Sequence, residues 1–398
     1  MTVREQVALS GYTTLGLGGP AARLVEADSD EEVLATVRAA DHRSEPVLVL
    51  GSGSNLVVAD AGFPGTVVRM LTKGVRLIAD DKPPGGESVL VTVAAGEDWD
   101  SLVERCVAEG LAGLECLSGI PGLAGATPIQ NVGAYGQEVA ETIVAVRAYD
   151  RARGQVLELT NADCGFGYRT SAFKREARNA PEHAPDHGPA PGSPFAATGR
   201  FVVLGVTFRL TRDRLSAPLR YGELARSLDI GPDGQAPLAD VRASVLSLRR
   251  RKGMVLDPDD PDTRSAGSFF TNPVLDQAQF AALAEAVVAT CGAGVEIPRY
   301  PAESGQVKVS AAWLIEHAGF AKGYPFDGVR DGAERKGAQA GEHAQGPRIS
   351  AKHTLALVNP GGSSTKALLD LAAEITDGVR QTFGVELVRE PVLVAGGA

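Results

Sequence analysis

The chain has 398 residues, and at about 100 to 200 residues per domain this length predicts two or three domains. Hydrophobic residues make up 44% and charged residues 22% of the sequence, which is ordinary globular composition and excludes a fibrous or globally disordered chain. The 39 Lys and Arg residues against 49 Asp and Glu give a net charge of −10, and no basic stripe stands out, which argues against nucleic acid as a partner.

The sequence has no pattern typical of a secreted protein, a membrane protein or a metal-binding protein. No apolar stretch has the length of a signal peptide core or a membrane span, so we expect a cytoplasmic protein with no membrane partner. No two cysteines form a CxxC pair and the six histidines are scattered, so we expect no metal site. The cysteines are expected to be reduced and mostly buried, at Cys106, Cys116, Cys164 and Cys291.

Helix and strand patterns alternate in the first half of the chain, which predicts an α+β or α/β class. Ser29 and Glu32 form a capping-box pattern ahead of an apolar helical face, and this helix leads into a strand at 47–50. The further elements expected, in chain order, are a strand at 89–95, a helix from Trp99 that ends at Gly110, strands at 143–149 and 201–210, mainly helices after about residue 245, and a last strand near 385–394. This order suggests a second domain inserted before the chain returns.

Two segments, 176–199 and 331–346, interrupt these patterns. Both are rich in Pro, Gly, Ala and charged residues and have no apolar periodicity. We interpret them as mobile surface insertions that carry little chemistry.

A first glycine segment, Gly51–Asn55, directly follows the strand at 47–50. Closely spaced glycines let backbone N–H groups approach a phosphate, and Ser54 and Asn55 can donate further hydrogen bonds. The dinucleotide fingerprint GxGxxG is not met, because Leu56 stands at the third glycine and an apolar strand follows. A phosphate-binding turn and a simple tight turn both fit.

A second, longer glycine segment runs from Ser118 to Gly136. Its five glycines lie among small and polar residues, which cannot form a core and suit a backbone lying against a flat, phosphate-bearing ligand. Two such segments in one chain indicate a large nucleotide cofactor. A third segment, Gly361–Thr365, has no Lys in the Walker position and is expected to cap a helix only.

The two glycine segments occur together with several specific sequence blocks. With Tyr12–Gly19 upstream, the chain closely resembles the UDP-N-acetylenolpyruvoylglucosamine reductase family, FAD enzymes of bacterial peptidoglycan synthesis, essentially from residue 10 to residue 395. The later blocks that carry the resemblance are GYRTSAFK at 167–174, SAGSFFTNP at 265–273, AWLIE at 312–316 and VELVREP at 385–391.

The resemblance implies an α+β fold: a vanillyl-alcohol-oxidase-type (PCMH-type) FAD-binding part of two subdomains, and a smaller α+β substrate-binding domain. The implied division is FAD-binding subdomain 1 at 1–75, subdomain 2 at 76–215, the substrate-binding domain at 216–380, and a C-terminal strand returning to the active site at 381–398.

The resemblance also implies the reaction. NADPH would reduce FAD, and the hydride would pass to the enolpyruvyl double bond of UDP-N-acetylglucosamine enolpyruvate to give UDP-N-acetylmuramate. We expect a monomer, and FAD that is noncovalent, since neither glycine segment contains His or Cys. The implied FAD-binding residues are Gly51, Ser52, Gly53, Ser54, Asn55, Ser118, Gly119, Ile120, Pro121, Gly122, Gly125, Ala126, Gln130, Asn131, Gly133, Ala134 and Tyr135.

Three residues match the family's catalytic groups. Ser268 matches the proton donor, and Arg169 matches the permanent charge that stabilises an enolate-like intermediate. Glu390 matches the catalytic glutamate that works with the arginine, with Glu386 as the competing candidate.

The substrate-binding residues implied by the resemblance are Tyr168, Lys174, Tyr221, Lys252 and Asn272. Tyr221 would lie in a loop that folds over the substrate diphosphate. The segment between Lys252 and the serine block is longer than the family pattern, so Arg249, Arg250 or Arg251 could take the place of Lys252.

Two other functions compete with this interpretation. A flavoprotein of the same fold could act on a different alcohol or hydroxy acid, and would be favoured by a flavin-attachment His or Cys in the glycine segments. A non-catalytic nucleotide-binding regulator would be expected to lack Ser268 or Arg169, and the sequence retains both.

Overall fold

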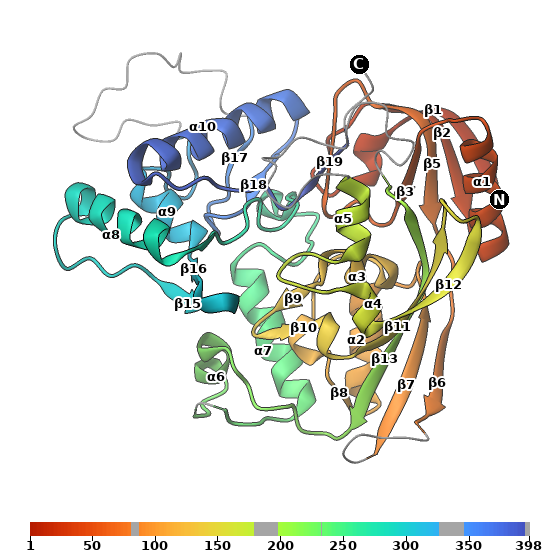
Figure 1. Ribbon diagram of the computed structural model, residues 1–398, viewed down its shortest axis with the longest axis horizontal. Coiled ribbons are helices and arrows are strands. Elements are labelled where there is room, and N and C mark those ends of the chain that lie inside the picture. The colour runs from red at the N-terminus through yellow and green to blue at the C-terminus, as the bar shows by residue number, and fades with distance from the viewer. Residues whose placement is uncertain (81–86, 179–197, 232, 326–345, 395–398) are drawn as a thin grey trace.

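Two β-sheets with their helices form one side of the molecule, and a helix-rich C-terminal part forms the other (Figure 1). The computed structural model describes residues 1–80, 87–178, 198–231, 233–325 and 346–394. The domain boundaries expected after residues 75, 215 and 380 stay predictions.

The first sheet holds the N-terminal strands in the order β1-β2-β5-β3. Its strands are β1 (Thr2–Ala8), β2 (Pro20–Ala27), β5 (Phe63–Met70) and β3 (Val47–Leu50). β2 and β3 both pair parallel to β5, and β1 pairs antiparallel to β2. The carboxyl end of β3 therefore lies at the sheet edge, directly before Gly51.

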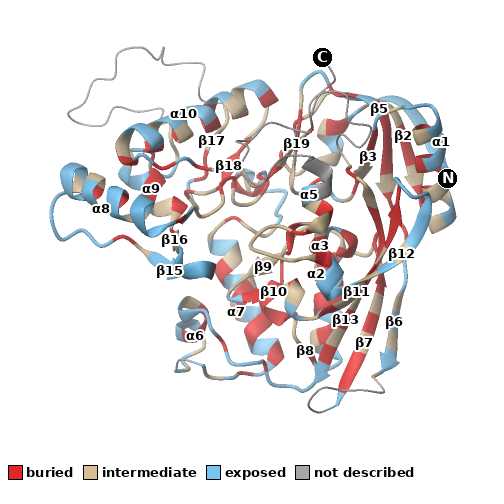
Figure 2. Cartoon of the chain, in the orientation of Figure 1, coloured by how far each residue is buried: buried red, intermediate tan, exposed pale blue. Residues whose placement is uncertain are grey.

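The second sheet is antiparallel, in the order β12-β11-β13-β7-β6, with β8 paired to β13. Its strands are β12 (Gln155–Thr160), β11 (Ile143–Asp150), β13 (Phe201–Arg212), β7 (Ser88–Ala94), β6 (Val75–Ala79) and β8 (Leu111–Ala112). The strands predicted at 89–95, 143–149 and 201–210 are confirmed within one or two residues at each end. Buried positions follow the central strands of both sheets (Figure 2).

Helix α1 (Asp30–His42) begins where the capping pattern predicts. The Ser29 hydroxyl accepts the Glu32 N–H at 3.3 Å, which satisfies one of the free donors of the first turn. Helix α2 (Trp99–Ala108) likewise begins after Asp98, whose carboxylate accepts the Ser101 N–H at 2.9 Å. Helix α1 packs its apolar face on β2, β5 and β3 of the first sheet, and the buried residues of α1 and α2 belong to one apolar cluster that also includes the second sheet.

The remaining elements of the described chain are short strands and further helices. The other helices are α3 (Thr127–Gln130), α4 (Asn161–Cys164), α5 (Ala172–Arg178), α6 (Gly222–Ser227), α7 (Leu238–Arg251), α8 (Gln277–Cys291), α9 (Ala311–His317) and α10 (Thr365–Phe383). The other strands are β9 (Gly133–Ala134), β10 (Gln137–Glu138), β14 (Val274–Leu275), β15 (Arg299–Pro301), β16 (Val307–Val309), β17 (Arg348–Ile349) and β18 (Leu357–Val358). Helices α8, α9 and α10 share one apolar core with Phe269 and Phe270.

The C-terminal segment returns to the N-terminal half, as expected. Strand β19 (Val392–Val394) pairs parallel with β4 (Leu56–Val58), which directly follows Asn55. The strand predicted near 385–394 is wrong in extent, because only its last three residues form one. Pro391 has no N–H for a ladder, and residues before it make only isolated backbone bonds to the 269–271 segment.

Several smaller predictions can be compared with the structure. Ser364 caps α10 by accepting the Ala367 N–H, as predicted for the third glycine segment. All four cysteines are free and three are buried. The predicted insertion 176–199 begins inside α5, which extends to Arg178, and its residues 179–197 lie outside the described residues, as do residues 331–345 of the second insertion.

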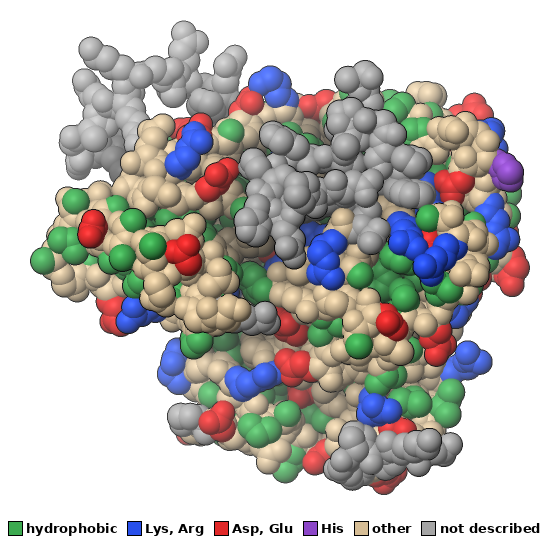
Figure 3. Space-filling view, viewed as in Figure 1, with side chains coloured by type: hydrophobic (Ala, Val, Ile, Leu, Met, Phe, Trp, Pro, Cys, Tyr) green, Lys and Arg blue, Asp and Glu red, His purple; other side chains and the backbone are tan. Residues whose placement is uncertain are grey.

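The surface carries both signs of charge. On the face shown in Figure 3, Lys and Arg side chains lie among Asp and Glu side chains. In the described ranges, no helix has the length and apolarity needed to cross a membrane.

Candidate active site

A cavity of about 760 Å³ lies between the carboxyl end of β3, strand β13 and the C-terminal segment. This volume is within the range of small-molecule and cofactor sites, about 300 to 1,000 Å³. The predicted site residues that line it are Gly51, Ser52, Gly53, Ser54, Asn55, Gly125, Ala126, Gln130, Tyr168, Arg169, Lys174 and Asn272.

The first glycine segment forms one wall of the cavity. Gly53 has φ +68°, and a Cβ there would lie 2.0 Å from the Tyr12 carbonyl oxygen, so only glycine fits this turn. The Ser54 hydroxyl donates to the Pro121 carbonyl at 2.9 Å. The two glycine segments, far apart in sequence, are therefore in direct contact.

The second glycine segment reaches the cavity at Gly125, Ala126 and Gln130. A Cβ on Gly125 would lie 2.4 Å from the Ala95 side chain, so the segment packs closely against the end of β7. The remaining predicted cofactor residues are not among those that line the cavity: Ser118, Gly119, Ile120, Pro121, Gly122, Asn131, Gly133, Ala134 and Tyr135.

Buried polar atoms without a partner mark this region as suited to a polar ligand. In the described part of the chain, Gln130 Nε2 and Arg249 Nε are buried without a hydrogen-bond partner. Arg249 Nε lies 3.4 Å from where a Cβ on Gly119 would stand, and burial lowers the pKa of its guanidinium. Such atoms are costly unless a ligand satisfies them, so the donor set fits a phosphate- and carbonyl-rich cofactor.

Two of the three predicted catalytic residues, Arg169 and Glu390, form an ion pair, and the backbone of the Ser268 block is joined to Glu390. Arg169 lines the cavity, whereas Ser268 and Glu390 are not among its lining residues. Arg169 Nε lies 3.1 Å from Glu390 Oε1, in an ion pair whose two side chains are about one-fifth exposed. The Glu390 N–H donates to the Phe269 carbonyl at 2.9 Å, so Glu390 is joined to the residue next to Ser268. Glu386 is exposed, which favours Glu390 between the two candidates.

The second glycine segment fixes the Arg169 side chain, and burial changes the pKa of its partner Glu390. Arg169 has φ +53°, a strained backbone for arginine, and its guanidinium donates to the Gly133 carbonyl at 2.7 Å. Burial raises the pKa of Glu390 above the usual range of a glutamate, while the cations Arg169 and Lys174 oppose that rise. Glu390 therefore protonates at higher pH than an exposed glutamate.

The comparisons with known proteins agree in one family. A model of an FAD binding domain matches residues 21–160, and a model of the UDP-N-acetylenolpyruvoylglucosamine reductase C-terminal domain matches residues 259–394. The UDP-N-acetylenolpyruvoylglucosamine reductase of Thermobifida fusca is 51% identical over 98% of this chain and 97% of its own. That of Streptomyces coelicolor is 50% identical over 97% of this chain and 88% of its own.

The chain belongs to the UDP-N-acetylenolpyruvoylglucosamine reductase family. A crystal structure of this reductase from Thermus caldophilus shares the fold, with a TM-score of 0.57 and 24% identity over 99% of this chain and 100% of that one. The family suggested by the sequence blocks is confirmed, and so is the α+β fold with an FAD-binding part. The vanillyl-alcohol-oxidase type of that part stays a prediction.

Three of the predicted substrate residues lie together beside the ion pair. Lys174 Nζ donates to Gln130 Oε1 at 2.7 Å and to the Arg169 carbonyl at 3.0 Å. Asn272 accepts the Ala311 N–H at 2.9 Å, which fixes it to the start of α9. Tyr168 lies under Lys308, whose ammonium is 4.4 Å from the ring centre.

The other two predicted substrate residues form a separate cluster with Tyr135. The Tyr221 and Tyr135 rings meet edge to face, 5.3 Å apart, and Lys252 Nζ lies 6.0 Å from the Tyr135 ring centre. Lys252 is also paired with Glu223 Oε2 at 2.7 Å. The structure does not bring Tyr221 and Lys252 onto the lining of the 760 Å³ cavity.

The sequence prediction missed most of the apolar wall that this reductase presents to its cavity. These residues include Leu48, Val49, Met70, Leu123, Ile129, Phe173, Val202 and Val203. Phe173 lies in a quoted family block, so that block was a usable signal. Leu123 and Ile129 lie in the second glycine segment, which was itself predicted to contact the cofactor. The others fit ordinary strand and core positions, because a cavity wall and a closed core have the same residue types.

Proposed function

We propose that this chain is an FAD-dependent oxidoreductase that uses NADPH to reduce UDP-N-acetylglucosamine enolpyruvate to UDP-N-acetylmuramate, a step of peptidoglycan synthesis. The observation that carries the proposal is the junction of the Ser268 block, Glu390 and Arg169 beside a cavity walled by the first glycine segment. The 51% identical relative is named for the reduction of this same type of substrate.

The residues that would hold FAD are the two glycine segments, with Gln130 of the second segment on the cavity lining. The unpartnered Nε2 of Gln130 is a donor, and FAD offers carbonyl, ring nitrogen and phosphate acceptors. When bound, FAD supplies hydride transfer between the nicotinamide and the enolpyruvyl carbon.

Arg169 and Ser268 would supply what the addition of hydride to an enolpyruvyl ether requires. The addition places negative charge on the substrate carboxylate side, where the permanent charge of Arg169 would stabilise it. Glu390 would hold the guanidinium in place through the 3.1 Å ion pair. The Ser268 hydroxyl would then give its proton to the neighbouring carbon.

Lys252 and its neighbours Arg249, Arg250 and Arg251 stay the candidates for binding substrate phosphate. Lys252 already has a carboxylate partner in Glu223, whereas no carboxylate pairs with Arg249 among the described residues. Tyr221, which is partly exposed and packs on Tyr135, would cover the diphosphate from the same side. We therefore assign Tyr221 to binding rather than to chemistry.

An assay of NADPH oxidation tests this function directly. The purified protein should oxidise NADPH rapidly only when UDP-N-acetylglucosamine enolpyruvate is present, with one product sugar formed per NADPH. Equal NADPH oxidation with and without this sugar would favour a flavoprotein with another substrate, and a colourless protein would favour a nucleotide-binding regulator. The preference for NADPH, the monomeric state and the cytoplasmic location stay predictions.

The flavin is expected to be bound without a covalent link. Among the described residues that line the cavity there is no His or Cys, the side chains through which a covalent flavin link would form. Acid precipitation of the yellow protein should release all flavin absorbance into the supernatant. Flavin absorbance that stays with the washed pellet would contradict this prediction.

A further inference from the structure

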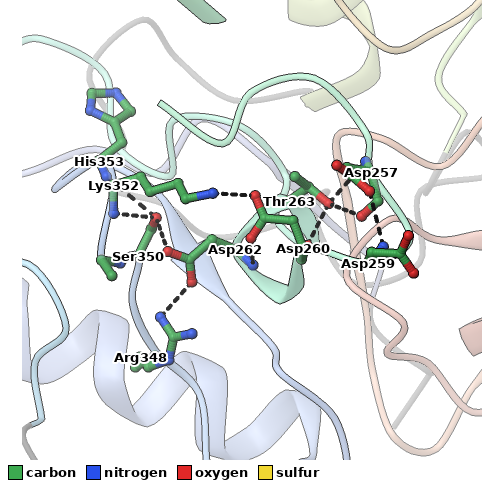
Figure 4. Close-up of polar contacts among 10 residues, drawn as sticks. Asp257, Asp259, Asp260, Asp262, Thr263, Arg348, Ser350, Lys352 and His353 are labelled. Carbon is green, nitrogen blue, oxygen red and sulfur yellow. Dashed lines mark hydrogen bonds and ion pairs between the residues drawn. The ribbon is translucent and has the colours of Figure 1, made fainter. Parts of the chain in front are cut away.

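The segment from Lys252 to Ser268 joins α7 to the catalytic serine block. Much of it contacts residues 348–359 of the C-terminal part, which include the paired strands β17 and β18 (Figure 4). We call these residues the 348–359 turn. Aspartates are frequent in this segment, at Asp257, Asp259, Asp260 and Asp262. Only one of them, Asp262, is buried.

Asp262 makes three contacts with residues 348–351. Its carboxylate lies 2.6 Å from Arg348 NH1, and it accepts the Ala351 N–H at 2.9 Å and the Ser350 hydroxyl at 3.1 Å. The Asp262 side chain is only 5% exposed, so these contacts replace its hydration. Ser350 Oγ also accepts the Lys352 N–H at 3.0 Å, so Asp262 organises the turn that follows β17.

Further contacts near Asp262 lie closer to solvent. Lys352 pairs with Asp260, and the Thr263 hydroxyl bonds the carbonyls of Asp257 and Asp260, each at 2.8 Å. In Figure 4 these bonds form one connected network from Asp257 to Arg348. The segment is thereby fixed at its middle to the 348–359 turn.

The same turn supports the backbone on both sides of Ser268. The Ser265 backbone forms a bridge with Val358, and the Phe269 N–H donates to the Leu355 carbonyl at 2.7 Å. Phe269 in turn accepts the Glu390 N–H. The position of Ser268 relative to Glu390 therefore depends on where the 348–359 turn lies.

We propose that Asp262 is a positioning residue for proton delivery: through Arg348 and Ser350 it fixes the 348–359 turn, and this turn sets the place of Ser268. The proposal rests on the proposed function, in which Ser268 is the proton donor. A buried carboxylate is sensitive in this role, because an amide in its place has no charge and only one acceptor oxygen: it can still accept from Ser350 and Ala351, but its NH2 group then faces the Arg348 guanidinium. Displacing a catalytic group by about 1 Å can cost about 10²-fold in rate.

The variant Asp262→Asn tests the proposal with little change of volume. We expect oxidation of the reduced enzyme by the enolpyruvyl sugar to slow by about 10-fold or more, while flavin reduction by NADPH stays within about twofold of the parent. Asp259→Asn is the matched control, because Asp259 is exposed in the same segment, and both steps should stay near the parent rates. Stopped-flow absorbance measures each step.

Two further variants keep the test decisive. Adding Arg348→Gln to Asp262→Asn should recover part of the lost rate, since it removes the unpaired cation. If Asp262→Asn fails to fold, Ser350→Ala keeps the Asp262–Arg348 ion pair, removes the Ser350 hydroxyl that joins Asp262 to the Lys352 and His353 N–H groups, and should still slow the substrate step selectively. Equal slowing of both steps, or an unchanged substrate step in a folded Asp262→Asn protein, would overturn the positioning role.

Amide hydrogen exchange separates this proposal from the proposed function. Exchange in 264–271 should become faster in Asp262→Asn and stay unchanged in Asp259→Asn. If the parent protein does not act on the enolpyruvyl sugar, the proposed function fails, yet this comparison still decides whether Asp262 fixes the serine block. Unchanged exchange in Asp262→Asn would overturn the proposal by itself.

Discussion

In Ser268→Ala, oxidation of the reduced enzyme by the enolpyruvyl sugar is expected to slow by about 10² to 10⁴, the range for loss of a positioned general acid. Flavin reduction by NADPH should stay near the parent rate, because that step creates no carbanion and needs no proton for the sugar. The reduced enzyme should therefore accumulate during turnover. Stopped-flow absorbance of the flavin, measured separately for each half-reaction, shows the difference.

Thr271→Val is the matched control for Ser268→Ala. It also removes a hydroxyl from the serine block, on a residue that lines the cavity, and leaves the side-chain volume almost unchanged. Both half-reactions should stay within a few-fold of the parent. If Ser268→Ala slows flavin reduction as much as the sugar step, then Ser268 is structural and the proton comes from another group.

Arg169→Met is expected to slow the sugar step by about 10² to 10³, the range for loss of one donor to a developing anion. It should also weaken sugar binding, since the fixed charge meets the ground-state carboxylate as well. The loss is larger than for a surface arginine, because the mostly buried Glu390 loses the cation with which it is paired. Single-turnover rates over a range of sugar concentrations give both the rate and the affinity.

Arg175→Met is the control for Arg169→Met, because Arg175 also lines the cavity but bonds only the Gly165 carbonyl, at 3.0 Å, in the described chain. Its sugar step should change by less than about fivefold. Equal rates for the two arginine variants would remove Arg169 from the catalytic group.

The pH dependence of the parent enzyme gives a second check on the ion pair. Because burial raises the pKa of Glu390, the midpoint of the acid-side loss of rate should lie at a pH above the ordinary glutamate range. This acid-side loss should disappear in Glu390→Gln.

Local sequence patterns predicted the elements that depend on neighbouring residues. The start of α1 could be read from Ser29 and Glu32, because a capping hydroxyl and the N–H that it accepts are three residues apart. The turn at Gly51–Asn55 followed from closely spaced glycines after a buried strand. The extent of the last strand could not be read, because the alternation from Val385 to Val388 resembles a strand although no long partner strand lies beside it.

Contacts between distant residues set the rest of the site. Arg169 and Glu390 were each suggested by a family block, but their pairing depends on the C-terminal return beside β4. The Asp262 contacts with Arg348 and Ser350 span more than 80 residues, and a run of aspartates in sequence reads as an exposed acidic loop. Burial distinguishes Asp262 from Asp259, and burial is a property of the assembled fold.

The pairing of β4 with β19 also bears on how the enzyme is made in the cell. β4 is synthesised more than 330 residues before its partner strand β19, so β4 stays unpaired while all of that stretch is made. The Asn55 carbonyl, at the end of the first glycine segment, accepts the Val392 N–H at 2.9 Å, so this segment too is completed only when β19 is present. Closure across so long a stretch of chain is slow relative to local folding. A nascent or prematurely terminated chain would therefore expose an apolar strand edge beside an unfinished cofactor site, which makes such chains targets for chaperones and proteases.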